Sequence, residues 1–105
     1  MKAWPERGES MSSVNIDTAL MLVKTRLNRM QKPEPTLDMY LTARIQAAVD
    51  EMKGAGIHLT CSAADMLLLV DYTVWQYQNR DQPQAMPEWL RLRRRERWVQ
   101  EGVKK

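Results

Sequence analysis

The side chains that could perform catalysis are few in this chain of 105 residues. His58 is the only histidine and Cys61 the only cysteine, three positions further on. In principle the two form a nucleophile and its general base, since an imidazole can remove the proton of a thiol. No acidic residue stands at a spacing that would orient the histidine. We therefore expect a solvated or locally hydrogen-bonded His58 and a Cys61 that serves as a small apolar filler ahead of a helix.

The acidic residues do not form a catalytic pair either. Asp50 and Glu51 are adjacent, so on a helix their side chains point about 100° apart. Asp65 and Asp71 are six positions apart with an apolar run between them. A single histidine with a single cysteine cannot fill a zinc site, and the four glycines do not form a phosphate-binding loop. The sequence predicts a protein that is not an enzyme and has no metal or cofactor.

The chemistry that the chain does offer is concentrated near its C-terminus. Five arginines lie within seven residues there, between two tryptophans. The arginines are Arg91, Arg93, Arg94, Arg95 and Arg97, and the tryptophans are Trp89 and Trp98. A guanidinium group binds carboxylates through two parallel hydrogen bonds and stacks on tryptophan, and both residue types are enriched where protein interfaces hold most of their binding energy. The segment is therefore typical of a protein–protein contact. Contact with nucleic-acid phosphates and a simple solvated end remain as alternatives.

On a helix these arginines spread around most of the circumference, whereas a helix lying on a membrane or in a DNA groove segregates its charge. We expect Trp89 and Trp98 to anchor the helix to the core or to a neighbour, with the arginines reaching outward. Asp71 follows five apolar residues and so requires either a partner or a path to solvent. Arg80 or a member of the Arg91–Arg97 set is the expected partner, and a solvent-facing Asp71 is the alternative.

The elements that must position these residues are helices. A first helix is expected from Asn15 or Asp17, either of which can cap it, to Met30, because apolar residues recur there at spacings of three and four. Two prolines then force a turn. A second helix, capped by Thr36, is expected to end near Lys53, where glycines supply stop signals.

The third helix is expected over residues 63–79, behind a capping box formed by Ser62 and Asp65. It is apolar over more than half its circumference, so it must be the central helix or face a second subunit. Pro87 suits the first turn of a fourth helix that runs toward Val99. Alternating strand patterns are absent. The fold class is predicted to be all-α, a small bundle of about four helices with a flexible N-terminal arm.

Length and composition indicate a single domain. Residues 1–13 mix Pro, Gly, Glu and Ser and are expected to form the flexible arm, which carries Trp4. Residues 14–100 are expected to form one helical domain and residues 101–105 a basic tail. The longest apolar run, Met66–Val70, is far shorter than the roughly 18 residues needed to cross a bilayer. With one cysteine, a reducing compartment such as the cytoplasm is expected, without membrane contact.

Charge is distributed unevenly along the chain. The net charge is +3, yet residues 87–105 contain seven basic and three acidic residues, while the remaining 86 residues contain nine basic and ten acidic ones. The positive charge therefore belongs to the C-terminal segment. Such a segment on a near-neutral body can face nucleic acid, an anionic membrane or an acidic patch of a partner.

Four stretches resemble the head–tail connector (adaptor) family of tailed bacteriophages and prophages. They are residues 38–52 with the following Gly54 and Gly56, residues 64–72, residues 75–81 and residues 86–91. The first contains an acid, a Leu, an Ile-x-Ala-Ala core and terminal glycines. The most distinctive element is Met86-Pro87, which leads into a hydrophobic–Leu–Arg helix after a tyrosine-rich helix. The resemblance covers roughly residues 15–98.

The resemblance implies a head-completion protein that assembles as a homo-oligomeric ring below the portal protein, at the DNA exit channel, and receives a stopper or tail-completion protein. Its setting would be the virion neck, and the host cytoplasm during assembly. DNA in the channel would be contacted non-specifically at most. Interface candidates carried over from the family are Trp75, Tyr77, Trp89, Arg91, Arg94, Arg95 and Trp98. Candidates for contact with DNA or an acidic partner are Arg93 and Arg97.

One feature departs from the family, since five arginines in seven residues exceed what it leads us to expect. An alternative of a different class is a small helical nucleic-acid-binding or regulatory protein that uses the Arg91–Arg97 helix as its contact. The two are separable, because binding to DNA phosphates depends steeply on salt and is lost when the arginines are neutralised.

Overall fold

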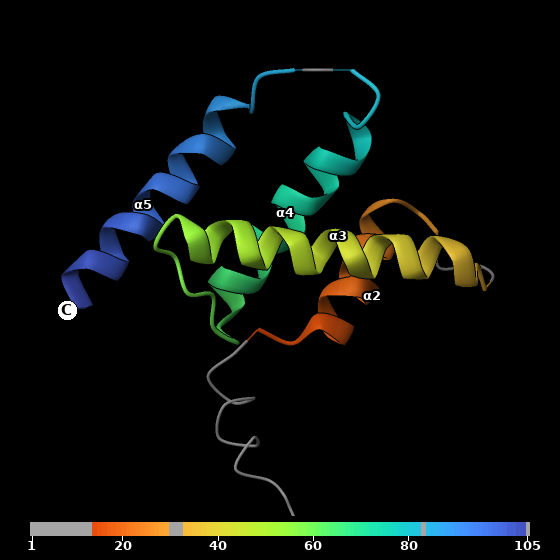
Figure 1. Ribbon diagram of the computed structural model, residues 1–105, viewed down its shortest axis with the longest axis horizontal. Coiled ribbons are helices and arrows are strands. Elements are labelled where there is room, and N and C mark those ends of the chain that lie inside the picture. Colours follow the sequence, from red (N-terminus) through yellow and green to blue (C-terminus); the bar gives the residue numbers. More distant parts are fainter. Residues whose placement is uncertain (1–13, 30–32, 83, 105) are drawn as a thin grey trace, which may run out of the picture.

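The computed structural model describes residues 14–29, 33–82 and 84–104, and this part of the chain contains four α-helices and no strand (Figure 1). The helices are α2 (Ile16–Arg26), α3 (Pro35–Gly54), α4 (Ala63–Gln78) and α5 (Glu88–Lys104). The predicted all-α bundle of four helices is confirmed. The arm expected over residues 1–13, with Trp4, lies outside the described residues. None of the described helices combines the length and apolarity needed to span a bilayer.

Helix α4 is the centre of the molecule. It packs against α2, α3 and α5, and half of its 16 residues are buried. This is the consequence of its sequence, since a helix that is apolar over more than half its circumference needs cover on more than one side. The prediction of a central helix is confirmed, and the cover comes from the same chain.

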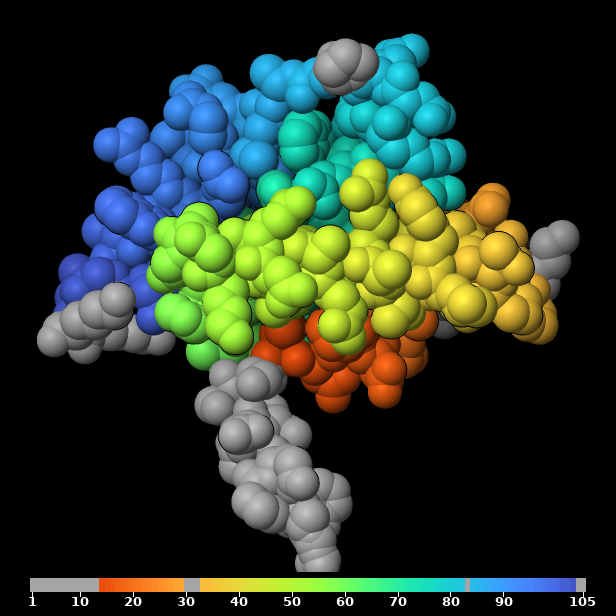
Figure 2. Space-filling model, in the orientation of Figure 1, coloured from red at the N-terminus to blue at the C-terminus, as the bar shows by residue number. Residues whose placement is uncertain are grey.

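The core lies where α2, α3 and α4 meet. Ala19 and Val23 of α2, Leu41 and Ile45 of α3, and Leu69 of α4 are completely buried. Side chains of this size each stabilise the fold by roughly 1.5–3 kcal/mol when they leave water, alanine excepted. Figure 2 shows α3, in yellow and green, running across one face of this group with α2 along its lower edge.

A polar contact joins α3 to α4 at the edge of this core. The Tyr72 hydroxyl donates to Glu51 Oε1 at 2.8 Å, and Gln76 Nε2 donates to the same hydroxyl at 3.2 Å. Burial of the phenol, together with the adjacent Glu51 carboxylate, raises the pKa of Tyr72 to about 12. The hydroxyl therefore stays protonated and remains a donor.

The helix ends show which capping predictions were right. Asn15 Oδ1 accepts from the Thr18 N–H at 3.0 Å, which confirms Asn15 as the cap of α2. The helix ends at Arg26 rather than continuing to Met30, and Asn28 adopts a left-handed φ of 59° two residues later. The prediction that Thr36 caps α3 is wrong. Proline at the first helical position suits the fixed φ of that residue, so α3 begins at Pro35.

The capping box predicted for α4 is only half formed. Ser62 Oγ accepts from the Asp65 N–H at 3.2 Å, but the Ser62 N–H donates to Thr60 Oγ1 at 3.3 Å rather than to the Asp65 carboxylate. The carboxylate is thereby available for other partners. The fourth predicted helix is present as α5, and it continues to Lys104, well beyond Val99. Residues 101–104, expected in a basic tail, are therefore helical.

Helix α5 is attached differently from the other three. Among the described helices it packs against α4 alone, and Figure 1 shows it at one side of the group formed by α2, α3 and α4. A helix with a single helical neighbour leaves much of its circumference uncovered. The arginines and tryptophans singled out in the sequence lie on this helix.

Candidate interaction surface on the C-terminal helix

Helix α5 has an inner and an outer face. Leu90 is completely buried and Arg97 is 8% exposed, which defines the inner face. Roughly 140° round the helix from these two residues, at 100° per residue, lies a row of exposed apolar side chains. The row contains Trp89 (50% exposed), Leu92 (42%), Val99 (49%) and Val103 (79%). An exposed apolar row of this length needs an explanation in a protein of this size.

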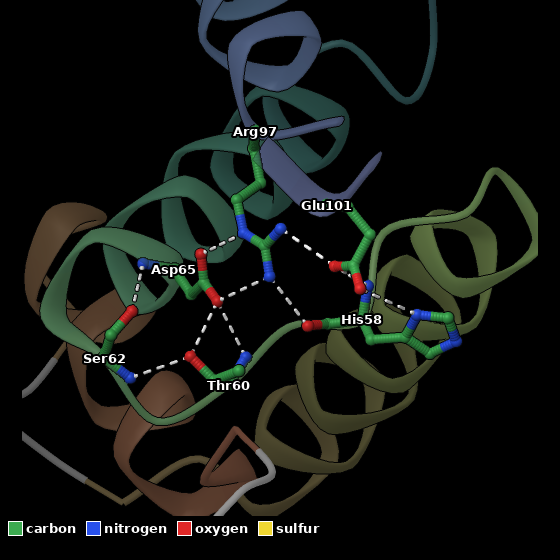
Figure 3. A network of polar contacts seen from close by, with 6 residues as sticks. All are labelled: His58, Thr60, Ser62, Asp65, Arg97 and Glu101. Atoms are coloured by element: carbon green, nitrogen blue, oxygen red, sulfur yellow. Dashed lines mark hydrogen bonds and ion pairs between the residues drawn. The ribbon is translucent and has the colours of Figure 1, made fainter. Parts of the chain in front are cut away.

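The inner face is held by a network of hydrogen-bonded ions around Arg97 (Figure 3). Arg97 Nε donates to Asp65 Oδ1 at 2.7 Å, and Nη2 donates to Asp65 Oδ2 at 3.2 Å. Nη2 also donates to the carbonyl oxygen of His58 at 2.9 Å, and Nη1 donates to Glu101 Oε1 at 2.9 Å. One guanidinium group thus joins α5, the first turn of α4 and the segment that connects α3 to α4. We call this set the Arg97 network.

Asp65 is the buried anion of the network. Burial by itself would raise the pKa of Asp65, but hydrogen bonds from Arg97 and from the backbone and hydroxyl of Thr60 outweigh it and lower that pKa below its ordinary value. The two donors of Thr60 each lie 2.8 Å from Asp65 Oδ2. The hydrogen bond to Asp65 in turn raises the pKa of Arg97. Both partners are therefore ionised at neutral pH although neither side chain is more than 9% exposed.

Glu101 closes the network at the far end of α5. Its Oε1 accepts from the backbone N–H of His58 at 3.2 Å, and its Oε2 lies 3.5 Å from the Nδ1 of the same residue. The hydrogen bond from His58 N–H, followed by that from Arg97, lowers the pKa of the Glu101 carboxyl. His58 is locally bonded, which is one of the two states expected from the sequence, and its imidazole is largely exposed.

A second ion pair ties the first half of α5 to two other helices. Arg93 Nη1 lies 2.6 Å from Asp71 Oδ2, and Arg26 of α2 pairs with Asp71 Oδ1. The expectation that Asp71 meets an arginine of the Arg91–Arg97 set is confirmed. Arg80, the other candidate, instead donates to the Tyr77 carbonyl and lies 4.0 Å above the centre of the Tyr77 ring.

The expectation that Trp89 and Trp98 anchor α5 to the core is wrong, and their anchoring to a neighbour stays a prediction. Both indoles are about half exposed, and the anchors are Leu90 and Arg97. Trp98 approaches the body of the protein at Gly56. A Cβ atom added to Gly56 would lie 3.3 Å from Trp98 Nε1, so the indole rests on the bare glycine backbone. Gly56 also adopts a φ of 96°, which disfavours any other residue there.

Three arginines of α5 are not used by the fold in this way. Arg91 has one long ion pair, 4.0 Å from Glu88. Among the described residues Arg94 and Arg95 form no ion pair and no hydrogen bond through their side chains. The three guanidinium groups line an open depression of about 310 Å³ with Trp98 and the short segment after α3. The lining residues are Ala55, Ile57, Arg91, Arg94, Arg95 and Trp98.

The remaining interface candidates lie on α4. Trp75 and Tyr77 are partly buried and pack against the core. The Tyr77 ring lies 6.0 Å from that of Tyr40, and that of Trp75 6.0 Å from that of Tyr72. The exposed candidate surface is therefore the part of the predicted set on α5, namely Trp89, Arg91, Arg94, Arg95 and Trp98.

Both of the residues predicted to contact DNA or an acidic partner are already bound to carboxylates of α4. Arg97, expected to touch DNA or an acidic partner, has a buried side chain whose three nitrogens all donate to protein oxygens. In this fold Arg97 therefore has little exposed guanidinium surface to offer to DNA or to an acidic partner. Arg93, the other residue predicted to make such a contact, is partly exposed and bound to Asp71. Sequence reasoning missed Glu101, although its spacing of four from Arg97 is a signal for a helical ion pair. It also missed Arg26 and Thr60, for which no local signal exists.

Comparison of the chain with models of protein families, with curated proteins and with solved structures gave no match. What the surface does must therefore be inferred from its own residues. Within the described ranges no group of three or more His, Cys, Asp or Glu side chains could hold a metal ion. The surface offers cationic forks beside exposed indoles and aliphatic side chains, which is chemistry for binding another macromolecule.

Proposed function

We propose that this protein is a structural assembly subunit, the head–tail connector of a tailed bacteriophage or prophage, and has no enzymatic activity. It would form a homo-oligomeric ring below the portal protein at the DNA exit channel and receive a stopper or tail-completion protein. One observation carries the proposal. Helix α5 is fixed to the body by the buried Arg97–Asp65 pair, the partly buried Arg93–Asp71 pair and Leu90, while it presents tryptophans, aliphatic side chains and three arginines outward.

A rigid mount is what an assembly surface requires. Binding costs less entropy when the contact side chains lie on an element that is already ordered. The Arg97 network and the Asp71 pair hold both halves of α5, so the outer face is presented as a unit. Such ion pairs add little net stability, because burying charges costs about as much as pairing them returns, and in this proposal their role is to fix the position of α5.

The contact residues in this proposal are those that the fold leaves available. Trp89 and Trp98 would supply apolar anchors, and Arg91, Arg94 and Arg95 would bind carboxylates of the portal, of the stopper or of the next subunit. The resemblance of residues 15–98 to the connector family supports the choice of this assembly. DNA passing through the channel would meet the same arginines non-specifically at most, and the site of action would be the virion neck.

The second candidate function is nucleic-acid binding through α5. It is favoured by Arg94 and Arg95, which form no ion pair among the described residues, and by Arg91, whose one ion pair with Glu88 is long at 4.0 Å. A phosphate backbone would accept these forks, and affinity would then fall steeply with salt. Titration of the protein with a short duplex at low and at moderate salt separates the candidates. Salt-dependent binding that is lost when Arg91, Arg94 and Arg95 are changed to Gln would favour this second function.

The connector proposal is tested in the genome that carries the gene. Deleting the gene should leave DNA-filled heads and free tails in the lysate, seen by electron microscopy, and a plasmid copy should restore complete particles. A plasmid copy with Trp98→Ala and Arg94→Gln should restore few, whereas one with Met39→Ala, a matched change at an exposed methionine of α3, should restore them fully. Complete particles after the deletion would refute the proposal.

A further inference from the structure

The exposed apolar row on α5 has the spacing of a coiled-coil seam. Its positions are Trp89, Leu92, Glu96, Val99 and Val103, separated by three, four, three and four residues. All five are exposed, and at 100° per residue they fall within about 80° of one another. Apolar residues at this alternation are what a second helix packs against, knobs into holes. We call this row the outer seam.

We propose that the outer seam pairs antiparallel with the outer seam of a second copy of this chain, giving a two-fold dimer of the unassembled subunit. The inference goes beyond the connector function and does not depend on it, because it rests on α5 alone. A two-fold contact requires a patch that is complementary to itself. The outer seam meets this requirement through the placement of its one charged residue.

Glu96 stands at the centre of the outer seam and decides the orientation. In a parallel pair each layer brings identical residues together, so Glu96 would face Glu96 of the other copy and the two carboxylates would repel. In an antiparallel pair the layers are mixed. With Glu96 level with Leu92 of the other copy, Trp89 becomes level with Val99. Antiparallel packing also places the opposite ends of the two helix dipoles side by side.

Beside the outer seam, Arg95 is the charge that can meet Glu96 in this arrangement, although the two-fold axis also brings the two Arg95 residues within about 3 Å of each other along the helix axis. Arg95 and Glu88 flank the seam on one side, and Arg93 and Gln100 flank it on the other. In the antiparallel pair the Glu96 carboxylate lies about one turn from Arg95 of the other copy, and the contact occurs twice by symmetry. The helix as a whole is basic, but Arg93 and Arg97 are already neutralised by Asp71 and Asp65.

The largest side chain of the outer seam is ordered before any partner arrives. The Arg93 guanidinium lies 5.9 Å from the centre of the Trp89 ring and is itself held by Asp71. This cation–π contact limits the conformations of the indole. A helix of 17 residues is only about 25 Å long, so the paired area is small. The dimer should therefore be weak and readily opened when a larger partner competes for α5.

The pairing is tested by sedimentation velocity on the full chain over a concentration series. The wild-type protein should show a concentration-dependent monomer–dimer equilibrium. The double change Leu92→Glu, Val99→Glu should raise the dissociation constant at least about tenfold, because it places one carboxylate level with Glu96 of the other copy and another against Trp89. Met21→Glu, Met39→Glu is the matched control, since both methionines are at least as exposed on other helices. It should leave the equilibrium unchanged. Circular dichroism checks that every variant is folded.

Cross-linking separates the two orientations. In a Cys61→Ser background, Val99→Cys protein should cross-link poorly with itself, because in the antiparallel pair the two positions lie about 15 Å apart along the axis. A mixture of Trp89→Cys and Val99→Cys proteins should cross-link efficiently with a short bismaleimide. Self-linking by Val99→Cys alone would indicate a parallel pair and would overturn the proposal.

Each other result also decides the proposal. A wild-type chain that stays monomeric at the highest concentration reached, or a dimer insensitive to Leu92→Glu, Val99→Glu, would overturn it. So would a closed oligomer of more than two copies in place of the dimer, which would assign the outer seam to a head-to-tail ring contact. The outcome is independent of the deletion phenotype, so loss of the dimer with an intact connector phenotype removes only this inference.

Discussion

Arg97 and Arg95 differ only in which side of α5 they occupy, and the contrast between the two sides explains most of what the helix does. Arg97 points inward, where each of its three side-chain nitrogens donates a hydrogen bond, to Asp65, Glu101 and the His58 carbonyl respectively. Arg95 is two positions earlier, exposed and without an ion pair among the described residues. The arginines concentrated in α5 thus have two unrelated roles: some hold the fold together, and others are exposed for contact with a partner.

The contrast also shows what determines the two uses. A guanidinium group is buried where the chain brings carboxylates and carbonyls to meet it, because an unpaired charge is too costly to remove from water. Asp65 and Asp71 are the two acidic residues on the covered part of α4, and each takes one arginine of α5. The arginines that face neither acid remain in solvent, available to a partner.

The largest effect expected is from breaking the buried pair. Asp65→Asn should lower the free energy of unfolding by about 3–5 kcal/mol, because it leaves the Arg97 charge buried without its main partner. Arg95→Met on the outer face should change it by less than about 0.5 kcal/mol. Urea unfolding followed by circular dichroism measures both. Equal effects of the two substitutions would show that the inner and outer arginines are equivalent.

Two leucines of α5 allow the inner and outer faces to be compared without any change of charge. Leu90→Ala should cost about 3 kcal/mol, since it opens a cavity at a fully buried position. Leu92→Ala, two residues along and exposed, should cost less than about 1 kcal/mol in the monomer. Both changes are the same in chemistry, so the difference in denaturant midpoint, measured at low protein concentration, reports only the face. A Leu92→Ala cost as large as that of Leu90→Ala would contradict the assignment.

A conservative change tests whether geometry as well as charge matters on the inner face. Arg97→Lys keeps the positive charge but not the planar fork that reaches Asp65, Glu101 and His58 together. It should cost about 2 kcal/mol through the lost charge-assisted hydrogen bonds. Arg95→Lys is the outer control and should be neutral in thermal unfolding. A neutral Arg97→Lys would mean that the network acts as a simple charge pair.

Acid should weaken the inner face selectively, and this is the smallest of the four effects. The pKa values of Asp65 and Glu101 are lowered in the folded protein. Their contribution to stability is therefore complete above the unfolded-state pKa, close to 3.8 for Asp65, and is lost as pH falls through the lower folded value. As pH falls below about 4, near the ordinary carboxyl pKa values, unfolding should become progressively easier in the wild type.

The control for this pH dependence is Asp65→Asn, which has no carboxyl to titrate at that position. Its free energy of unfolding should fall less over the same acid range than that of the wild type. Parallel pH profiles for the two proteins would show that Asp65 does not titrate below its ordinary range, and that hydrogen bonds from Arg97 and Thr60 do not outweigh its burial.

Sequence reasoning predicted the frame of the fold because its signals are local. Helix periodicity, the Asn15 and Ser62 caps and the prolines act over a few residues, so four helices and a central α4 follow from the sequence. The same reasoning failed where neighbours compete. Thr36 is a good cap by type, yet Pro35 takes the first turn. Trp89 and Trp98 have the composition of core anchors, yet their positions round α5 leave them about half exposed, where only a neighbour could cover them.

By itself the sequence determined the helices, the all-α class and the concentration of arginine and tryptophan at the end of the chain, because each depends on residues close together along it. Only the tertiary structure decided which arginines are structural. Arg97 meets Asp65 from 32 positions away and Arg26 meets Asp71 from 45 positions away. Such pairings depend on how α2 and α5 are set against α4, and long-range packing, unlike helix formation, leaves no local pattern in the sequence.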